Sequence, residues 1–573
     1  MGRTSCNPPD MLSRKTVIVG CVVAGCHAPI ESAPDAGDAN GVGALVDSGM
    51  SWPEGQSFPS FAHITTLDVI DMAGRSADVG VMLATLEGQV NKTRPRIYLE
   101  YPQAAANAPP GGVNEGPTFW LDKLGASVST VTDPIALVKK YETAIKGVVI
   151  YNDTDASTDL VAPHTINLAT TIAGLKGGIV VSPSLYAQLE AAAIDLPKLA
   201  DFSRTSFKTV DAVYQTALDC CAASLSRRLI VGLDPTRATG PRDLAVAVGA
   251  MVMWLPTTDP LFDTFVARLE INSPYVGWYQ DEQAGVIATS AHAVPTYAAD
   301  DFYNMTVLAG SSRTIHVPTP PPPPPLENKI YVAIFMSDGD NLGEDQHTIP
   351  NRYRWADPNR GKVPISWTIN PGLVDVAPVM LEYYWSTVTP NDVLVSGPSG
   401  LGYTYPGRWL ASSFDEYAER TAKYIAAAGL RVITVWNDSA FSIAKLTPNN
   451  ATAYTTHLPH LLGLTIQDST QTLQVLDGKL PLAPLTRSST AQYADTEADL
   501  ESGIEAAAAG WDGTSPRFVA VQGNMNKTTA ITPTAFLKVQ QDIEQSRPGD
   551  YVFVRADHLF QLIRKSKRLA VDP

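Results

Sequence analysis

The sequence predicts an α/β protein in which one or more small α/β domains precede a C-terminal (β/α)-barrel-like domain. Strand-like apolar runs alternate with helical segments from Phe58 onward, a pattern typical of parallel sheets. A proline run at 318–326, PTPPPPPPL, divides the chain, because consecutive prolines form a stiff extended spacer. Seven strand candidates follow within about 245 residues, close to the ~250 residues of a typical barrel.

Residues 1–26 predict an export signal. Arg14 and Lys15 precede an apolar run at 16–25, which is far shorter than the ~20 residues that span a bilayer and is typical of a signal peptide. The run ends in VAGC, which resembles the bacterial lipobox, so we expect acylation of Cys26. The protein is then exported and lipid-anchored to the bacterial cell envelope, with no other membrane contact.

Residues 27–57 predict a disordered tether, because Ala, Gly, Asp, Ser and Pro dominate the segment and bury little apolar surface. The net charge of the chain is -16, which disfavours nucleic acid as a partner and leaves neutral glycans open. Cys220 and Cys221 are adjacent within the helical stretch TALDCCAASL. Neighbouring cysteines rarely form a disulfide, so we expect two buried thiols.

Residues 58–317 predict the N-terminal α/β region, which could contain two or three subdomains. Apolar runs of strand length bounded by polar or turn residues predict its strands. They are LDVIDM, PRIYLEY, GVVIYND, GGIVVSP, RLIVGLDP and AVGAMVMWLP. Apolar residues at three- and four-residue spacing predict helices in SADVGVMLATLEGQVN and TINLATTIAGL.

Residues 327–573 predict the barrel-like domain. The seven strand candidates are KIYVAIF, KVPISWTI, NDVLVSG, RVITVW, HLLGLTIQ, PRFVAVQ and DYVFVRA. The clearest helix is FDEYAERTAKYIAAAGL, which Gly429 closes as a C-terminal cap. Two later segments, TEADLESGIEAAAAGW and TAFLKVQQDIEQSR, predict further helices.

In such a barrel the active site lies at the carboxyl ends of the strands. These ends carry carboxylates suited to acid–base or nucleophilic chemistry, with aromatic rings and amides suited to sugar faces and hydroxyls. The catalytic candidates are Asp338, Asp340, Asp438 and Asp468. The candidates for substrate binding are Asn341, Trp367, Tyr403, Tyr405, Trp436, Asn524 and His558.

The segment SDGDN at 337–341 carries the strongest catalytic candidates. If strand geometry persists, Asp338 and Asp340 leave one face with Cα atoms ~7 Å apart, and each charge raises the proton affinity of the other. Glycosidases usually take their carboxylates from different strands, so Asp438 or Asp468 is an equal partner. The segment is also ordinary turn chemistry, or part of a metal site completed by His347 or His558. An EF-hand is excluded, because apolar residues stand at its ligand positions.

The segment GLGYTYP at 400–406 raises a separate question, because a turn does not need aromatic rings. Gly400 and Gly402 allow positive φ and close backbone approach. Tyr403 and Tyr405 face the same side of an extended segment, so they line a groove or pack beneath the loop. Farther upstream, GWYQDE at 277–282 carries two acids that either reach the same cleft or form a surface loop.

GLGYTYP matches in full the motif of the GxGYxYP family of glycoside hydrolases. The segments NKTRPRIYLEY, GWYQDE, DFYNMTVL and SDGDN also resemble that family, so the resemblance covers nearly all of the chain after the tether. It implies a multi-part N-terminal region, a barrel-like C-terminal domain and hydrolysis of glycosides.

Our main hypothesis is therefore a glycoside hydrolase that acts on an extracellular or periplasmic oligo- or polysaccharide, without a metal or other cofactor. One carboxyl group protonates the leaving oxygen, and another acts as base or nucleophile. The alternatives are a glycan-binding lipoprotein without catalysis and a metal-dependent carbohydrate deacetylase, in which the metal activates water. The oligomeric state stays open.

Overall fold

The computed structural model describes residues 49–101, 117–438, 445–467, 472–486, 493–527 and 529–573. Within these ranges the named strands pair in parallel, apart from one hairpin, and helices alternate with them. The predicted α/β class is thereby confirmed. Cys26 and residues 27–48 of the predicted tether lie outside the described residues. In the described part of the chain, no helix is long and apolar enough to cross a bilayer.

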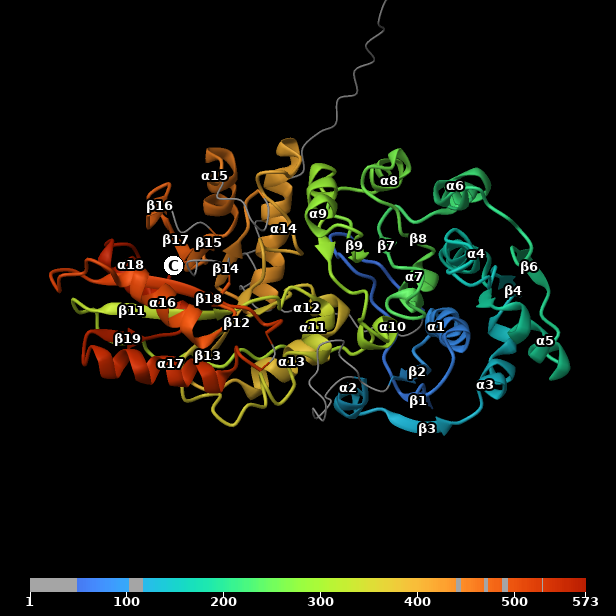
Figure 1. The fold of residues 1–573 in the computed structure, drawn as a ribbon, viewed down its shortest axis with the longest axis horizontal. Coiled ribbons are helices and arrows are strands. Elements are labelled where there is room, and N and C mark those ends of the chain that lie inside the picture. Colours follow the sequence, from blue (N-terminus) through green and yellow to red (C-terminus); the bar gives the residue numbers. More distant parts are fainter. Residues whose placement is uncertain (1–48, 102–116, 439–444, 468–471, 487–492, 528) are drawn as a thin grey trace, which may run out of the picture. The chain divides into compact units, whose positions relative to one another are not determined.

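The first sheet has the strand order β2-β1-β3 (Figure 1). Its central strand is buried at residues 67–70, as expected for a parallel strand that helices cover. The elements are β1 (Thr66–Asp71), α1 (Ala77–Asn91), β2 (Ile97–Glu100), α2 (Pro117–Leu124), β3 (Ser127–Val131) and α3 (Pro134–Lys140).

The second sheet has the order β5-β4-β6, and all residues of β4 and β5 are buried. Helix α4 ends at Gly177, whose φ of 78° lies in the left-handed region that favours glycine. The elements are β4 (Val148–Ile150), α4 (Thr165–Lys176), β5 (Ile179–Val181), α5 (Pro183–Ala191), β6 (Lys198–Asp201) and α6 (Val210–Cys221).

The cysteines at the end of α6 correct the sequence-based prediction. Cys220 and Cys221 form a disulfide with each other, and Cys220 is exposed rather than buried. The helix ends at this point, because Cys221 has φ -144° and ψ 11°, outside the helical region. The uninterrupted helix on which the prediction depended is therefore absent here.

The third sheet has the order β10-β9-β7-β8. Strands β7 and β9 approach closely, because a Cβ on Gly277 would lie 1.9 Å from the carbonyl oxygen of Gly232. The elements are β7 (Ile230–Gly232), α7 (Arg242–Val248), β8 (Met251–Met253), α8 (Pro260–Val266), β9 (Tyr275–Gly277), α9 (Glu282–Ala291), β10 (Thr296–Tyr297) and α10 (Met305–Leu308).

A pair of acids is sealed where α1 packs against α7. Glu87 and Asp243 are only 2% and 1% exposed. Asp243 accepts hydrogen bonds from the backbone N–H and the hydroxyl of Thr306, both at 2.8 Å. Burial raises the pKa of Asp243 to about 6, and burial together with the charge of Asp243 raises the pKa of Glu87.

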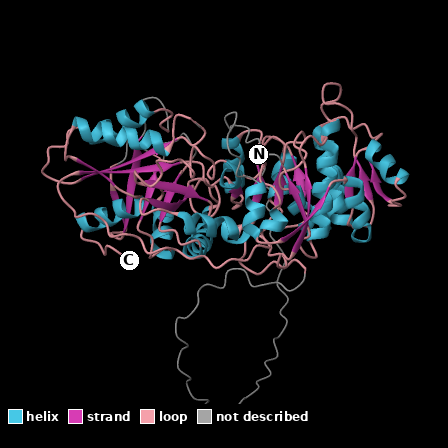
Figure 2. Ribbon diagram, turned by 90° about the horizontal axis from the view of Figure 1, so that it is seen from below, coloured by secondary structure: helices cyan, strands magenta, loops and turns pink. Residues whose placement is uncertain are grey.

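The C-terminal region is a closed barrel of seven parallel strands surrounded by helices (Figure 2). The order is β11-β12-β13-β14-β15-β17-β18, and β18 pairs with β11 along its whole length. The ring closes where Phe335 and Met336 of β11 pair with Ser366 and Trp367 of β12. The barrel strands are β11 (Ile330–Met336), β12 (Ile365–Ile369), β13 (Asp392–Ser396), β14 (Val432–Val435), β15 (Gly463–Ile466), β17 (Leu480–Thr486) and β18 (Arg517–Gly523).

Helices follow most of these strands. Near-complete burial of the strands shows that helices cover the barrel outside while side chains fill its interior. The helices are α11 (Leu342–His347), α12 (Leu373–Val376), α13 (Pro378–Thr387), α14 (Phe414–Ala427), α15 (Pro448–His457), α16 (Glu497–Ala508), α17 (Pro533–Ser546) and α18 (Ala556–Ser566).

One of the seven barrel strands differs from the predicted set. The sequence pattern does not predict β17, because Pro481 and Pro484 lack the N–H that a central strand normally donates. The predicted seventh strand, β19 (Tyr551–Phe553), pairs only with residues 330–332 of β11 and does not take part in the closure. A short strand β16 (Gln474–Leu476) forms an antiparallel hairpin with β17.

The segments at the two predicted boundaries also pack against the folded chain. Residues 318–326 form no helix or strand, and the carbonyl of Pro325 accepts a hydrogen bond from Tyr331. Residues 49–57, assigned to the tether, contact the third-sheet region: Arg228 stacks on the Trp52 ring at 4.3 Å and donates to its carbonyl. The folded part therefore begins before Phe58. Short 3₁₀ turns lie at Glu142–Ala144, Ala162–His164, Ala222–Ser224 and Ala411–Ser413.

Candidate active site

Asp338 and Asp340 lie in the turn that follows β11, at the mouth of the barrel. The strand geometry does not persist as predicted, because Asp338 has a φ of 63° and the chain turns there. Gly339 fits closely against β12: its N–H donates to the Thr368 hydroxyl at 2.9 Å, and a Cβ would lie 1.7 Å from the Thr368 carbonyl oxygen. The glycine therefore fixes the turn that presents both acids, which stay partly exposed.

The two carboxyl groups have different surroundings. Burial raises the pKa of Asp338 to about 6, while hydrogen bonds from Ser337 and the Met525 backbone and the charge of Arg354 oppose the rise. Burial raises the pKa of Asp340 well above its usual range, and the charge of Asp338 raises it further. Asp340 thus retains its proton to a higher pH than Asp338 does. The negative charge of Asp338 has more stabilising contacts.

Helix α11 adds further acids directly behind this turn. Asn341, predicted to bind substrate, instead caps the helix, since its side-chain oxygen accepts from the N–H of Gly343 at 2.8 Å. Burial raises the pKa of Glu344 to about 8, and it raises the pKa of the fully buried Asp345 as well. The sequence pattern does not distinguish these two acids, because their helical position resembles an ordinary capped first turn.

The glycine-rich loop reaches Asp340 through Gly397. A Cβ on Gly397 would lie 2.5 Å from the Cβ of Asp340, so only glycine lets the loop approach this closely. Farther along the loop, Tyr403 forms two backbone hydrogen bonds with Thr296 of β10, at 2.7 and 3.1 Å. The loop therefore connects the barrel mouth to the third sheet.

Tyr403 and Tyr405 do not line an open groove, which was one of the two predictions for this loop. Tyr403 is 2% exposed and Tyr405 is 0% exposed, so the alternative, rings packed beneath the loop, describes the structure. The two hydroxyl groups are 2.8 Å apart. The Tyr403 hydroxyl also donates to Oε1 of Glu282 at 2.9 Å.

Glu282 brings a carboxylate from the N-terminal region to the same mouth. It is the first residue of α9, whose N-cap Asp281 accepts from the Ala284 N–H at 2.8 Å. Glu282 is exposed, and its charge raises the pKa of both Asp338 and Asp340. The segment GWYQDE signalled an acid pair, but no spacing in the sequence places it beside a turn more than 50 residues away.

Aromatic rings surround these acids. Trp436 is 5% exposed, and its ring centroid lies 5.3 Å from that of Tyr403 and 5.9 Å from that of Tyr493. Trp278 and Tyr493 keep part of their surface exposed. Burial and the charges of Asp338 and Asp340 raise the pKa of Tyr493. The ring surface open to a ligand thus belongs to Trp278 and Tyr493, neither of which was predicted as a site residue.

Buried amides lie at the ends of two barrel strands. Gln467, after β15, donates to Oε1 of Gln522 in β18 at 2.9 Å. Oε1 of Gln467 and Nε1 of Trp436 have no hydrogen-bond partner among the described residues. Both atoms are buried, so the structure does not offer them to a ligand.

Two predicted substrate-binding residues lie elsewhere. Trp367 is 1% exposed, packs on Trp355 and donates from Nε1 to Asp392 at 2.9 Å. His558, at the start of α18, is 8% exposed and its Nε2 bonds the carbonyl of Pro321 at 2.8 Å. Both predictions took nearness in sequence to a strand end as evidence of access, and burial removes that access.

The remaining predicted residues are engaged or lie outside the described ranges. Asp438 forms an ion pair with Arg408 at 2.6 Å. Asn524 is partly exposed and donates to Asp495 at 2.8 Å. Asp468 lies outside the described residues. Across the described ranges, no three His, Cys, Asp or Glu side chains gather closely enough to hold a metal ion.

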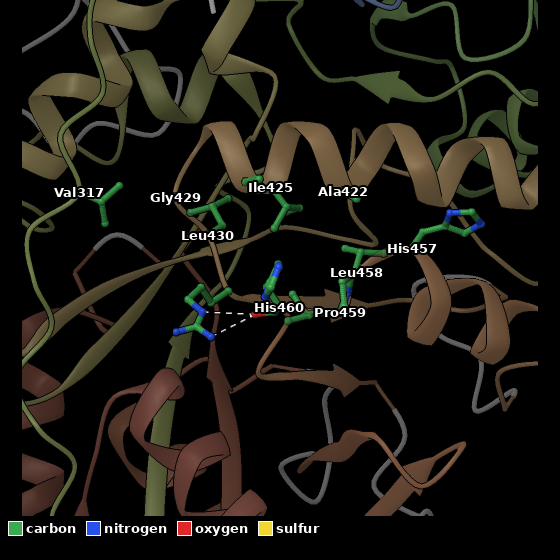
Figure 3. Close-up of a pocket in the computed structure, with 12 residues that line it drawn as sticks. Val317, Ala422, Ile425, Gly429, Leu430, His457, Leu458, Pro459 and His460 are labelled. Atoms are coloured by element: carbon green, nitrogen blue, oxygen red, sulfur yellow. Dashed lines mark hydrogen bonds between the residues drawn. The ribbon is translucent and has the colours of Figure 1, made fainter. Parts of the chain in front are cut away.

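An apolar cavity of about 340 Å³ lies between α14 and the segment that follows α15 (Figure 3). Ile425, Leu430 and Leu458 line it, and Arg431 donates two hydrogen bonds to the carbonyl of His460 at its edge. Its lining holds no carboxylate, so we do not assign hydrolysis to it.

Known proteins resemble the chain over most of its length. Three family models match: the GxGYxYP putative glycoside hydrolase C-terminal domain at residues 328–564, the GxGYxYP_N second domain at 145–221 and the GxGYxYP third domain at 227–310. A search of curated proteins found no match.

Solved structures also resemble the chain. A putative hydrolase from Bacteroides thetaiotaomicron has 20% sequence identity and a TM-score of 0.74, covering 90% of this chain and 99% of its own, which shows a shared fold. A putative polysaccharide deacetylase from Mycobacterium smegmatis has 12% identity and a TM-score of 0.29, covering 44% and 97%, which does not indicate a shared fold. From the family matches, the chain belongs to the GxGYxYP putative glycoside hydrolase family.

Proposed function

We propose that the protein hydrolyses glycosidic bonds of an oligo- or polysaccharide at the mouth of the barrel. The observation that carries this proposal is the pair Asp338 and Asp340, two partly exposed carboxyl groups in one turn with unequal support for negative charge. Glycosidases need one carboxyl that holds a proton and one carboxylate that does not, and unequal surroundings produce that division.

Asp340 is the proton donor in this proposal. Burial and the neighbouring charge of Asp338 keep its proton bound, so it can protonate the leaving oxygen as the C–O bond breaks. Asp338 carries the negative charge, which Ser337, the Met525 backbone and Arg354 support. That charge stabilises the positive charge that develops on the sugar ring in the transition state.

The aromatic groups of the mouth support a carbohydrate as substrate. Trp278 and Tyr493 offer partly exposed ring surface for the C–H faces of a sugar. This assignment replaces Tyr403 and Tyr405 as direct ligands.

Purified protein and Asp340→Asn should be incubated with a panel of plant, fungal and bacterial polysaccharides, with products separated by chromatography. We expect the wild-type protein to release oligosaccharides and the variant to release far less. Binding without release by the wild-type protein would favour the glycan-binding alternative. Release that Asp340→Asn retains would remove this acid from the mechanism.

We also propose that the protein is exported and lipid-anchored, on the basis of the VAGC segment that ends at Cys26. Metabolic labelling with a radioactive fatty acid should mark the wild-type protein and not Cys26→Ala. Equal labelling of both would contradict acylation at Cys26.

A further inference from the structure

We propose that Glu282, contributed by the third-sheet region, is the second catalytic carboxylate of this site, and that Tyr403 is its positioning residue. This inference rests on the proposed glycoside hydrolysis and deepens it. It assigns a reacting group to a part of the chain outside the barrel and gives the tyrosines of the GLGYTYP segment a defined task.

The geometric evidence for this proposal is that one loop contacts both Asp340 and Glu282. At one end, Gly397 lies against Asp340 so closely that a Cβ would come within 2.5 Å of the Asp340 Cβ. Six residues later, the Tyr403 hydroxyl donates to Glu282 at 2.9 Å. Asp340 and Glu282 thus approach the mouth from two different elements, the β11 turn and α9, which allows the two carboxyl groups to flank a glycosidic bond.

The position of Glu282 is fixed at several points. The Tyr403 backbone is bonded twice to Thr296, and the Tyr405 hydroxyl lies 2.8 Å from that of Tyr403. Asp281 caps the same helix turn from which Glu282 projects. Glu282 as a whole residue nevertheless keeps exposed surface, so its side chain can contact both water and substrate.

The charged and titratable groups around Glu282 come from three further elements. Asp281 precedes it on its own helix, Tyr403 and Tyr405 face it from the loop, and the turn after β11 contributes Asp338 and Asp340; Tyr493 interacts with all three acids. Burial raises the pKa of Glu282, and donation from Tyr403 opposes the rise. The phenol therefore favours the ionised form, which a base requires.

In the proposed step, the oxygen of a water molecule bonds to the anomeric carbon while the bond from that carbon to the leaving oxygen breaks. The leaving oxygen takes the proton of Asp340, and Glu282 takes a proton from the attacking water. Proton exchange with solvent then returns Asp340 to its neutral form and Glu282 to its ionised form, so the cycle is balanced.

The decisive variant is Glu282→Gln in the full chain, because glutamine still accepts the Tyr403 hydrogen bond but cannot take a proton. We expect kcat to fall by ~10²–10⁴-fold while the thermal unfolding midpoint changes little. Gln283→Ala, an exposed neighbour on the same helix turn, should keep wild-type kcat. Formate should restore part of the activity of Glu282→Ala.

Positioning by Tyr403 predicts a pH effect that a merely structural role would not cause. Tyr403→Phe removes the donor that favours the ionised carboxylate, so the acidic limb of the kcat/KM profile should move to higher pH. Tyr405→Phe, one hydrogen bond farther away, should move it less.

The outcomes separate this inference from the proposed function. If Asp340→Asn is inactive and Glu282→Gln has wild-type kcat, Glu282 is not catalytic, although the hydrolysis stands. If the wild-type protein releases no product from any substrate, the proposed function and this inference are both overturned. Loss of activity in both variants, with a shifted limb in Tyr403→Phe, supports the assignment.

Discussion

Two pairs of carboxyl groups in this molecule share a chemical property and differ in access. Glu87 and Asp243 lie between α1 and α7, and Asp338 and Asp340 lie at the barrel mouth; burial raises the pKa of all four. The first pair is at most 2% exposed, whereas both members of the second pair keep exposed surface. A raised pKa therefore reports burial in either place, and only the open pair can meet a substrate.

The largest expected effect comes from the open pair. Asp340→Asn keeps the size of the side chain and removes its proton, so we expect kcat to fall by ~10²–10⁴-fold with little change in the thermal unfolding midpoint. Steady-state rates and a thermal melt measure both quantities. Asp243→Asn, the matched change in the sealed pair, should leave kcat near the wild-type value. A similar loss of activity in Asp340→Asn and Asp243→Asn would contradict the view that only the exposed pair of acids takes part in catalysis.

The next effect concerns the loop that touches the open pair. In Gly397→Ala the added methyl would come within 2.5 Å of the Asp340 Cβ, so the carboxyl must move. A displacement near 1 Å can cost up to ~10²-fold in rate, and kcat should record it. Gly80→Ala is the control, because its methyl would meet no atom closer than 3.3 Å. Wild-type kcat in Gly397→Ala would show that the position of Asp340 is not critical.

A smaller effect is expected from the ring surface of Trp278, whose centroid lies 6.4 Å from that of Tyr403. Trp278→Ala removes a partly exposed ring, and a loss of about 1.4 kcal/mol corresponds to a roughly tenfold higher KM. Titration of initial rates against oligosaccharide concentration measures it. Trp511→Ala changes a partly exposed tryptophan that lies three residues after α16 and should keep the wild-type KM. Equal KM values for all three proteins would place the sugar elsewhere.

The last expected effect is on stability and not on activity. An acid whose pKa is raised by folding stabilises the protein most below its unfolded pKa, and that contribution is lost as pH rises through the folded value. For Glu344 the window runs from its ordinary value of 4.5 to about 8. We expect Glu344→Gln to reduce the loss of unfolding free energy between pH 5 and 8.5 by on the order of 4 kcal/mol. Urea unfolding at both pH values measures it.

The exposed Glu505→Gln on α16 is the control for that experiment and should not change the pH dependence. An unchanged slope in Glu344→Gln would mean that Glu344 is not the source of the stability loss.

The sequence predicted the fold class, the parallel sheets and six of the seven barrel strands, because buried parallel strands are continuous apolar runs with clear ends. It missed β17, since Pro481 and Pro484 are atypical of a central strand. It also misjudged Cys220 and Cys221, because the end of α6 at Cys221 depends on backbone geometry that composition does not reveal.

For the site, the sequence indicated the turn at 337–341 and the glycine loop, because unusual residues at strand ends can be recognised from the sequence alone. Access is a property of packing, which is why Trp367 and His558 were expected at the mouth and lie buried. Glu282 is more than 50 residues from Asp338, and only the folded chain brings their charges together.

The backbone pairing of Tyr403 with Thr296, and the bond from the Leu342 N–H to the Ala298 carbonyl at 2.8 Å, have a consequence for evolution and engineering. A chimaera that joins the N-terminal region of one relative to the barrel of another must preserve both sets of backbone hydrogen bonds. Without them, the glycine-rich loop is no longer held against the third sheet. We therefore expect the N-terminal region and the barrel to evolve together. Exchange of segments between homologues should give a folded protein only when the third-sheet region and the barrel come from the same homologue.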